Sequence, residues 1–304
     1  MGAASSKMSA HAGTRETGDF LVSHKIGVAQ SADGTRITHR VFGDQGPPIV
    51  LVHGGLQAAQ NFQRLAEHLS AHFIVYVPER RGRRPEVPAG EGYGLAREGE
   101  DLDALMRTVG ARRLFGLSSG ATIALYTAIQ FSGVEKVALY EPPLTIDGAD
   151  PASWVPNFDR ALLAGNRASA MAEILKGTAG REYIARLPRF VLAALLRIVI
   201  EIEARQSADD DIALKDLIPT MRLDSIVQRE SITMVNPRIS ELRSDVLLLS
   251  GEKSPAALHL ALDAIAKRLP NAQRVELEGV GHIAADNRGA PGEVARLLED
   301  FFDA

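Results

Sequence analysis

A serine framed by two glycines is the group in this chain whose chemistry is easiest to recognise. Residues 114–125 read LFGLSSGATIAL, a short apolar run followed by G-x-S-x-G and an alanine-rich stretch. Between a strand and a helix this pattern is typical of a nucleophile elbow, a sharp turn that exposes the serine hydroxyl. Gly116 and Gly120 would give the strand and the helix room to pass each other. We predict that Ser118 is a catalytic nucleophile.

A histidine near the end of the chain is suited to be the general base for that serine. Residues 277–282 read LEGVGH, so that His282 follows a strand-like segment in a glycine-flanked loop. Histidine is the usual base for a serine nucleophile. Six other histidines lie in the N-terminal segment, in the first strand pair or in helical patterns, and we do not favour them: His11, His24, His39, His68, His72 and His259.

The acid that would orient the imidazole is not at its usual position. That position follows the strand before the last helix–strand pair, and Ser254, which cannot carry a negative charge, stands there. Two carboxylates could replace it: Glu141, directly after the strand-like segment 136–140, and Glu252. We favour Glu141, because its strand should neighbour the elbow strand. Glu252, another carboxylate or none at all remain alternatives.

The oxyanion donors are expected in the segment His53-Gly54-Gly55, directly after an apolar strand-like run. Its backbone N–H group at Gly55 (or Gly54) and that of Ser119 could stabilise a tetrahedral oxyanion. The loss of one such donor typically lowers the rate by ~10²–10³. We give the His53 side chain a structural role.

Strand and helix patterns alternate along most of the chain, which indicates an α/β fold with a mostly parallel sheet of eight strands. The strand patterns cover 25–29, 36–42, 48–52, 73–77, 114–117, 136–140, 246–250 and 274–277. The helical patterns between them cover 61–70, 96–109, 119–131, 256–269 and 291–302. Such alternation predicts helices on the faces of one sheet.

The alternation stops in the middle of the chain. Residues 144–240 are helical in pattern, as in 161–175 and 189–205, and we expect them to form a cap over the carboxyl ends of the strands, where ligands bind in α/β sheets. We therefore predict a disordered tail at 1–18, a core made of 19–143 and 241–304, and a helical cap at 144–240.

These residues together resemble the α/β-hydrolase superfamily, over residues 37–302. The resemblance implies an α/β-hydrolase fold, and the order Ser118, Glu141, His282 matches the superfamily's order of nucleophile, acid and base. Residues 116–121 with a glutamate after the following strand resemble the zearalenone-type lactonases, whose acid is a glutamate at this earlier strand end. The resemblance supports Glu141 and leaves the substrate open.

A second segment resembles a loop of the same superfamily, which usually reads D-x-R-G-x-G. Here residues 79–84 read ERRGRR, so that Arg84 replaces the last glycine. The charges suggest either a phosphate site or a salt-bridged structural loop. We favour the structural loop, with Arg97 and Glu98 as partners.

Composition limits the classes of function. The chain has 304 residues, 45% of them hydrophobic, a net charge of -4 and no cysteine. The charge argues against nucleic-acid binding, and the absence of cysteine excludes disulfides and thiolate chemistry. No dinucleotide fingerprint or metal-ligand cluster is visible, so we expect neither a cofactor nor a metal. We also expect a cytoplasmic location, no membrane partner and a small-molecule substrate, and leave a homodimer open.

The sequence thus predicts a serine hydrolase that cleaves an ester, lactone or thioester of a hydrophobic small molecule. Two alternatives remain. A ligand-binding or weakly active protein on the same scaffold would explain why Ser254 stands where an acid is expected. A carbon–carbon bond hydrolase would use the same serine chemistry.

Overall fold

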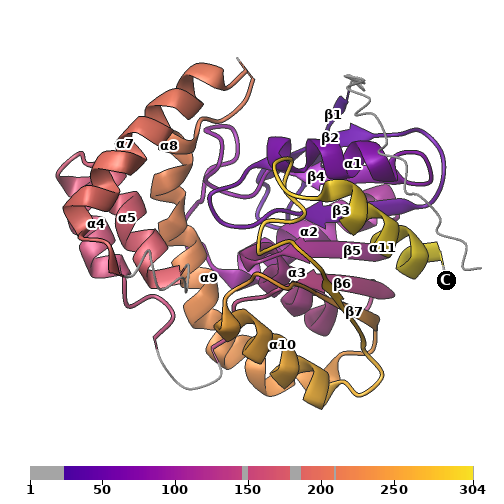
Figure 1. Cartoon of the computed structure of the whole chain (residues 1–304). Coiled ribbons are helices and arrows are strands. Elements are labelled where there is room, and N and C mark those ends of the chain that lie inside the picture. Colours follow the sequence, from indigo (N-terminus) through magenta and orange to yellow (C-terminus); the bar gives the residue numbers. More distant parts are fainter. Residues whose placement is uncertain (1–23, 146–149, 179–185, 209, 304) are drawn as a thin grey trace, which may run out of the picture.

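A computed structural model describes residues 24–145, 150–178, 186–208 and 210–303 of the chain (Figure 1). The predicted tail at 1–18 lies outside these ranges. One sheet of eight strands forms the centre of the molecule, with the spatial order β1-β2-β4-β3-β5-β6-β7-β8. The strands are β1 (Lys25–Gln30), β2 (Arg36–Phe42), β3 (Pro48–Val52), β4 (Ile74–Pro78), β5 (Arg113–Leu117), β6 (Lys136–Tyr140), β7 (Asp245–Gly251) and β8 (Gln273–Leu277).

The sheet is mostly parallel. Strand β2 pairs antiparallel with β1 and with β4, and all other neighbours run parallel. The predicted α/β class with an eight-stranded, mostly parallel sheet is confirmed. The central strands are continuous apolar runs, because parallel strands are covered on both faces.

Helices cover both faces of the sheet. On one face α2 (Leu95–Val109), α3 (Ser119–Gln130) and α10 (Ala256–Arg268) pack against a core that includes Val50, Leu114 and Leu139. On the other face, α1 (Gln63–Leu69) and α11 (Pro291–Asp303) pack against side chains that alternate with these along the strands, such as Leu51 and Phe115. A short 3-10 helix, η1 (Ala59–Phe62), precedes α1.

A helical insertion separates β6 from β7, and Figure 1 shows most of its helices to one side of the sheet. It consists of α4 (Val155–Leu163), α5 (Arg167–Thr178), α7 (Arg189–Gln206), α8 (Leu214–Leu217), η2 (Ile218–Thr220), α9 (Met221–Met234) and η3 (Asn236–Glu241). In the described ranges, no helix combines the length and apolar character needed to cross a bilayer.

The helix predicted at 161–175 is in fact two helices, which is a correction. Gly165 has φ +69°, a left-handed conformation that ends α4. The Asn166 side chain then accepts the Ser169 N–H at 3.0 Å, as an N-cap residue does for a new helix. Gly165 therefore marks the end of α4, and Asn166 marks the beginning of α5.

The strand register brings the ends of three strands to one edge of the sheet. Val52 of β3 lies beside Gly116 of β5, and Leu117 of β5 lies beside Tyr140 of β6. The residues that directly follow these strands therefore emerge side by side, at the edge where α/β proteins bind their ligands.

Candidate active site

The turn at Ser118 has the strained backbone of a nucleophile elbow. Ser118 has φ +57° and ψ -123°, and its N–H donates to the Tyr140 carbonyl at 2.8 Å. A Cβ on Gly116 would lie 2.4 Å from the Gly120 carbonyl oxygen, and one on Gly120 would lie 2.3 Å from that of Val52. No side chain fits at either glycine, because strand β5, helix α3 and strand β3 approach each other closely there.

Backbone strain in the described ranges is concentrated at this site. The non-glycine residues with positive φ are Leu56, Ser118 and Glu141, with φ of +56°, +57° and +48°. All three follow the carboxyl end of a strand at the same sheet edge. Such conformations cost of order 1–3 kcal/mol each and cluster at functional sites.

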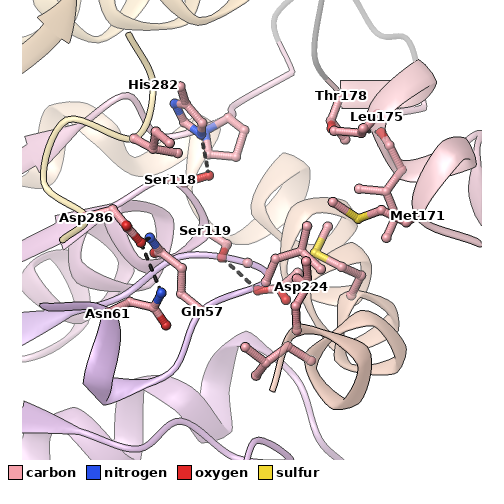
Figure 2. Close-up of a pocket in the computed structure, with 18 of the residues that line it drawn as sticks. Gln57, Asn61, Ser118, Ser119, Met171, Leu175, Thr178, Asp224, His282 and Asp286 are labelled. Atoms are coloured by element: carbon pink, nitrogen blue, oxygen red, sulfur yellow. Dashed lines mark hydrogen bonds between the residues drawn. The ribbon is translucent and has the colours of Figure 1, made fainter. Parts of the chain in front are cut away.

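Ser118, His282 and Glu141 form a hydrogen-bonded series in which His282 contacts each of the other two. His282 Nε2 is 3.0 Å from Ser118 Oγ, a contact drawn in Figure 2, and His282 Nδ1 is 2.6 Å from Glu141 Oε2. The structure thus brings together the nucleophile, base and acid that the sequence predicts. The His282 side chain is 30% exposed, whereas that of Glu141 is fully buried.

Glu141 is held on both of its oxygens. Its Oε1 accepts the Gly251 N–H at 2.7 Å, which leaves Oε2 for the imidazole. The loop that carries His282 is fixed as well, because the Tyr140 hydroxyl donates to the Gly281 carbonyl at 2.9 Å. Adjacent residues at the end of β6 therefore position both Glu141 and His282.

Glu252, the alternative candidate for the acid, lies at the surface of the protein. Glu252 is exposed, and its Oε2 accepts the Gly279 N–H at 2.8 Å, so that it stabilises the turn before His282. The Ser254 hydroxyl is buried and has no hydrogen-bond partner among the described residues. No carboxylate from this strand end reaches His282.

Two backbone amides beside Ser118 are free to donate. In the part of the chain that the structure describes, neither the Gly55 nor the Ser119 N–H has a hydrogen-bond acceptor, and both residues line the cavity that contains Ser118. The Gly54 N–H, in contrast, donates to Gln57 Oε1 at 2.8 Å. Of the two glycines, only Gly55 remains a candidate donor.

Comparison with known proteins places the chain in a family. The family model for the alpha/beta hydrolase family matches residues 49–297. The chain belongs to the alpha/beta hydrolase family. It is 32% identical over 117 residues to the uncharacterized hydrolase YraK of Bacillus subtilis, and 30% identical over 122 residues to the N-formylmaleamate deformylase of Pseudomonas putida. These matches cover 37% and 39% of this chain and 43% and 46% of the relatives, so the chain spans less than half of their length.

Solved structures of other proteins have a similar fold over most of the length of this chain. An alpha/beta hydrolase from Sphaerobacter thermophilus is 28% identical with a TM-score of 0.72, and the alignment covers 91% of this chain and 100% of that one. The enol-lactonase from Burkholderia xenovorans is 22% identical with a TM-score of 0.66, with the same coverage of both chains. At this identity, the enol-lactonase supports the fold alone.

A chain of polar hydrogen bonds, which the sequence analysis missed, fixes the segment His53-Gly54-Gly55 of this hydrolase. Gln57 accepts the Gly54 N–H and donates to Asp286 Oδ2 at 2.8 Å, and Asn61 donates to the same oxygen at 3.1 Å. Figure 2 shows these side chains beside Ser118. Because Asp286 follows His282 by four residues, these hydrogen bonds connect the segment His53-Gly54-Gly55 to the loop that carries His282. No sequence signal pairs residues so far apart.

Residues 79–84 form a buried network of ion pairs. Arg80 bonds to Glu98 at 2.9 Å and to Asp224 at 3.0 Å, and Arg83 bonds to Asp224 at 2.7 Å. The interpretation as a salt-bridged loop and the pairing with Glu98 are confirmed, whereas Arg97 pairs with Glu100 instead. Asp224 lies on α9, so this network joins the core to the helical insertion.

A cavity of about 600 Å³ opens beside Ser118, a size that suits a small organic ligand. Its far wall comes from the insertion, and Figure 2 shows Met171 and Leu175 across from Ser118. The remaining apolar lining includes Ile174, Ile212, Leu214, Leu217, Met221, Leu258 and Ile283. Among the described residues, no group of three His, Asp or Glu side chains is arranged to hold a metal.

The large residues of the insertion lie partly in its core and partly at its surface. Trp154, Phe158 and Met221 are buried in one cluster, and Met221 also lines the cavity. Phe190, in contrast, is 76% exposed on α7. Tyr183 lies outside the described residues.

We expect His53 to lower the stability of the folded protein in acid. The side chain is fully buried, and burial together with the charges of Arg80 and Arg83 holds the pKa of its imidazole well below the ordinary value. The unfolded chain, with a histidine pKa of ~6.5, therefore binds a proton that the folded chain does not. Below that pH we expect stability to fall, and the free energy of unfolding should fall less steeply in His53→Asn than in the wild type between pH 6.5 and 5.

Urea unfolding at several pH values checks this prediction. His72→Asn, which replaces an exposed histidine, is the matched control and should follow the wild-type pH dependence. A His53→Asn variant that loses stability as steeply as the wild type would show that acid acts through other groups.

Proposed function

We propose that this chain is a serine hydrolase that cleaves an ester, lactone or thioester of a hydrophobic small molecule. The observation that carries the proposal is the continuous contact from Ser118 Oγ through the His282 ring to the buried Glu141 carboxylate, at 3.0 and 2.6 Å. Fold membership alone would not support an activity, because hydrolase scaffolds serve many functions.

The chemistry follows from this geometry. Ser118 Oγ attacks the carbonyl carbon while His282 Nε2 takes its proton, and Glu141 stabilises the imidazolium. The Gly55 and Ser119 N–H groups donate to the oxyanion of the tetrahedral intermediate. The intermediate collapses when His282 returns the proton to the leaving oxygen or sulfur, which produces an acyl-enzyme. Water, deprotonated by His282, then releases the acid and restores the Ser118 hydroxyl.

The cavity supports the hydrophobic part of the proposal. Its wall opposite Ser118 consists mainly of Met, Leu and Ile side chains from the insertion. Transfer of apolar surface from water into such a site is favourable by ~25 cal/mol per Å². A substrate with an extended apolar acyl or alcohol group would therefore bind better than a small polar one.

Fluorophosphonate labelling tests the proposal. An active serine should react with a fluorophosphonate–biotin probe, and mass spectrometry of the digested protein should find the label on the peptide that contains Ser118. The p-nitrophenyl esters of acetate, butyrate and octanoate should then be hydrolysed, the longer ones with the higher kcat/KM.

The alternatives give other results. No label at all would favour a ligand-binding protein on this scaffold, and a label on another serine would overturn the assignment of Ser118. A label on Ser118 without hydrolysis of any ester would favour the carbon–carbon bond hydrolase.

A further inference from the structure

The side chain of Ser119 belongs to the buried ion-pair network. Its Oγ donates to Asp224 Oδ1 at 2.7 Å, a bond drawn in Figure 2, and accepts from Arg80 Nη1 at 3.1 Å. Ser119 is 2% exposed. The residue whose backbone N–H faces the reaction is therefore anchored through its own side chain to a carboxylate of the helical insertion.

Arg80 connects the two halves of the oxyanion hole. One nitrogen, Nη1, lies 3.3 Å from the His53 carbonyl oxygen as well as 3.1 Å from Ser119 Oγ. His53 precedes Gly55 by two residues, so one guanidinium holds the segments that carry both donors. The other side of Arg80 is fixed by Glu98, through Nε at 3.1 Å and Nη2 at 2.9 Å.

Asp224 is ionised and firmly held. Burial alone would raise the pKa of its carboxyl, but the charges of Arg83 and Arg80 and the hydrogen bond from Ser119 outweigh burial and lower that pKa. Asp224 Oδ2 accepts from Arg83 at 2.7 Å, so both oxygens are used. Two arginines face two carboxylates, Asp224 and Glu98, and the network therefore places no net charge beside the oxyanion.

Helix α9 also lies directly over the second donor. A Cβ on Gly55 would be 2.8 Å from Met221 Sδ and 3.4 Å from Asp224 Cγ. The oxyanion hole is thus enclosed between the core and one turn of α9, and Asp224 is adjacent to both of its segments.

We propose that Asp224 is a positioning residue, which fixes the Ser119 N–H in the orientation that the oxyanion requires. This role rests on the proposed function of Ser118. Ser119 is the first residue of α3, so its N–H has no partner within the helix. Donors act only when they lie ~2.7–3.1 Å from the oxyanion, and small displacements at a reaction centre are costly. The anchored side chain restricts how the peptide between Ser118 and Ser119 can turn.

Ser119→Ala is the direct test. This variant removes the anchor and keeps the backbone N–H, and Arg80 and Asp224 still pair with each other, so that no buried charge is left alone. We expect kcat for p-nitrophenyl butyrate to fall about tenfold with little change in KM, the pattern of an interaction made only in the transition state.

Two ketones separate this role from a general structural one. Ser118 Oγ adds to the carbonyl carbon of 1,1,1-trifluoro-2-octanone while its proton moves to His282 Nε2, which gives a hemiketal whose oxyanion occupies the hole; 2-octanone binds without such a charge. In Ser119→Ala the trifluoromethyl ketone should lose affinity about as much as kcat falls, and 2-octanone should bind as before. Ser225→Ala, which removes a buried hydroxyl that donates to the Arg222 carbonyl at 2.7 Å within α9, is the matched control and should change neither kcat nor the affinity for either ketone.

A double-mutant cycle assigns the effect to Asp224. Asp224→Asn should lower kcat several-fold in the wild type and by a smaller factor in Ser119→Ala, because the two residues share one hydrogen bond. Unchanged kcat and ketone affinity in Ser119→Ala would overturn the role while leaving the proposed function intact, as would an equal loss of affinity for both ketones. A wild-type protein that binds neither ketone and hydrolyses no ester would overturn both proposals.

Discussion

Ser118→Ala is expected to lower kcat for p-nitrophenyl butyrate by about 10⁵- to 10⁶-fold. The variant loses the only hydroxyl within reach of His282 Nε2 in the described structure, so no acyl-enzyme can form. The Gly55 and Ser119 amides and the cavity remain, and they should support a residual rate of ~10³–10⁴ over the uncatalysed reaction. Steady-state kinetics and the loss of fluorophosphonate labelling measure the effect.

The control for this variant is Thr122, which lies in α3, four residues after Ser118. Thr122 is buried and its hydroxyl has no partner among the described residues, so that Thr122→Val keeps the shape and should keep the wild-type kcat. The Ser118→Ala variant should also bind 2-octanone as the wild type does. A Ser118→Ala variant with more than a few per cent of wild-type activity would show that another group, or a water molecule, is the nucleophile.

The central strands could be predicted almost residue by residue. The apolar runs at Pro48–Val52 and Lys136–Tyr140 are strands with the predicted bounds, because a parallel strand buried on both faces needs no alternation and ends where the polar loop begins. The residues that follow these strands could be placed in the same way. Parallel strands end at one edge, so that Gly55, Ser118 and Glu141 were expected to meet there.

Sequence alone could not predict the network around Asp224. Arg80 and Asp224 are 144 residues apart, and their contact depends on how α9 docks on the core. One signal was available: Asp224, Ser225 and Gln228 are polar residues on the buried side of α9, which a helix packed on a hydrophobic core alone would not have. Buried polar side chains on a helix require partners, and for Asp224 these are Arg80, Arg83 and Ser119 of the core.

Glu141→Gln should lower kcat by about 10⁴-fold at an unchanged yield of folded protein. The Gly251 N–H donates to one oxygen of Glu141 and would repel an amide NH₂ group, so the oxygen of the glutamine should stay on Gly251. Its NH₂ group would then face His282 Nδ1 and favour the tautomer whose Nε2 carries the proton. That nitrogen could no longer accept the proton of Ser118. The pre-steady-state rate of p-nitrophenol release measures this acylation step.

Glu252→Gln is the matched control, because it keeps an acceptor for the Gly279 N–H and changes the charge of a carboxylate that does not touch His282. It should retain kcat within about twofold. A collapse of kcat in Glu252→Gln and a nearly silent Glu141→Gln would reverse the assignment of the acid.

Ser254→Asp in the Glu141→Gln background tests whether an acid after β7, its usual position, can replace Glu141. The Ser254 hydroxyl is buried without a partner, so an aspartate there would gain from contact with a histidine that can become charged. If its carboxylate reaches Nδ1, kcat should recover at least tenfold over Glu141→Gln alone. Recovery would mean that a residue after either β6 or β7 can supply the acid in this chain. Without recovery, the left-handed turn at Glu141 is the conformation that brings a carboxylate to His282, and its backbone strain is then part of the catalytic site.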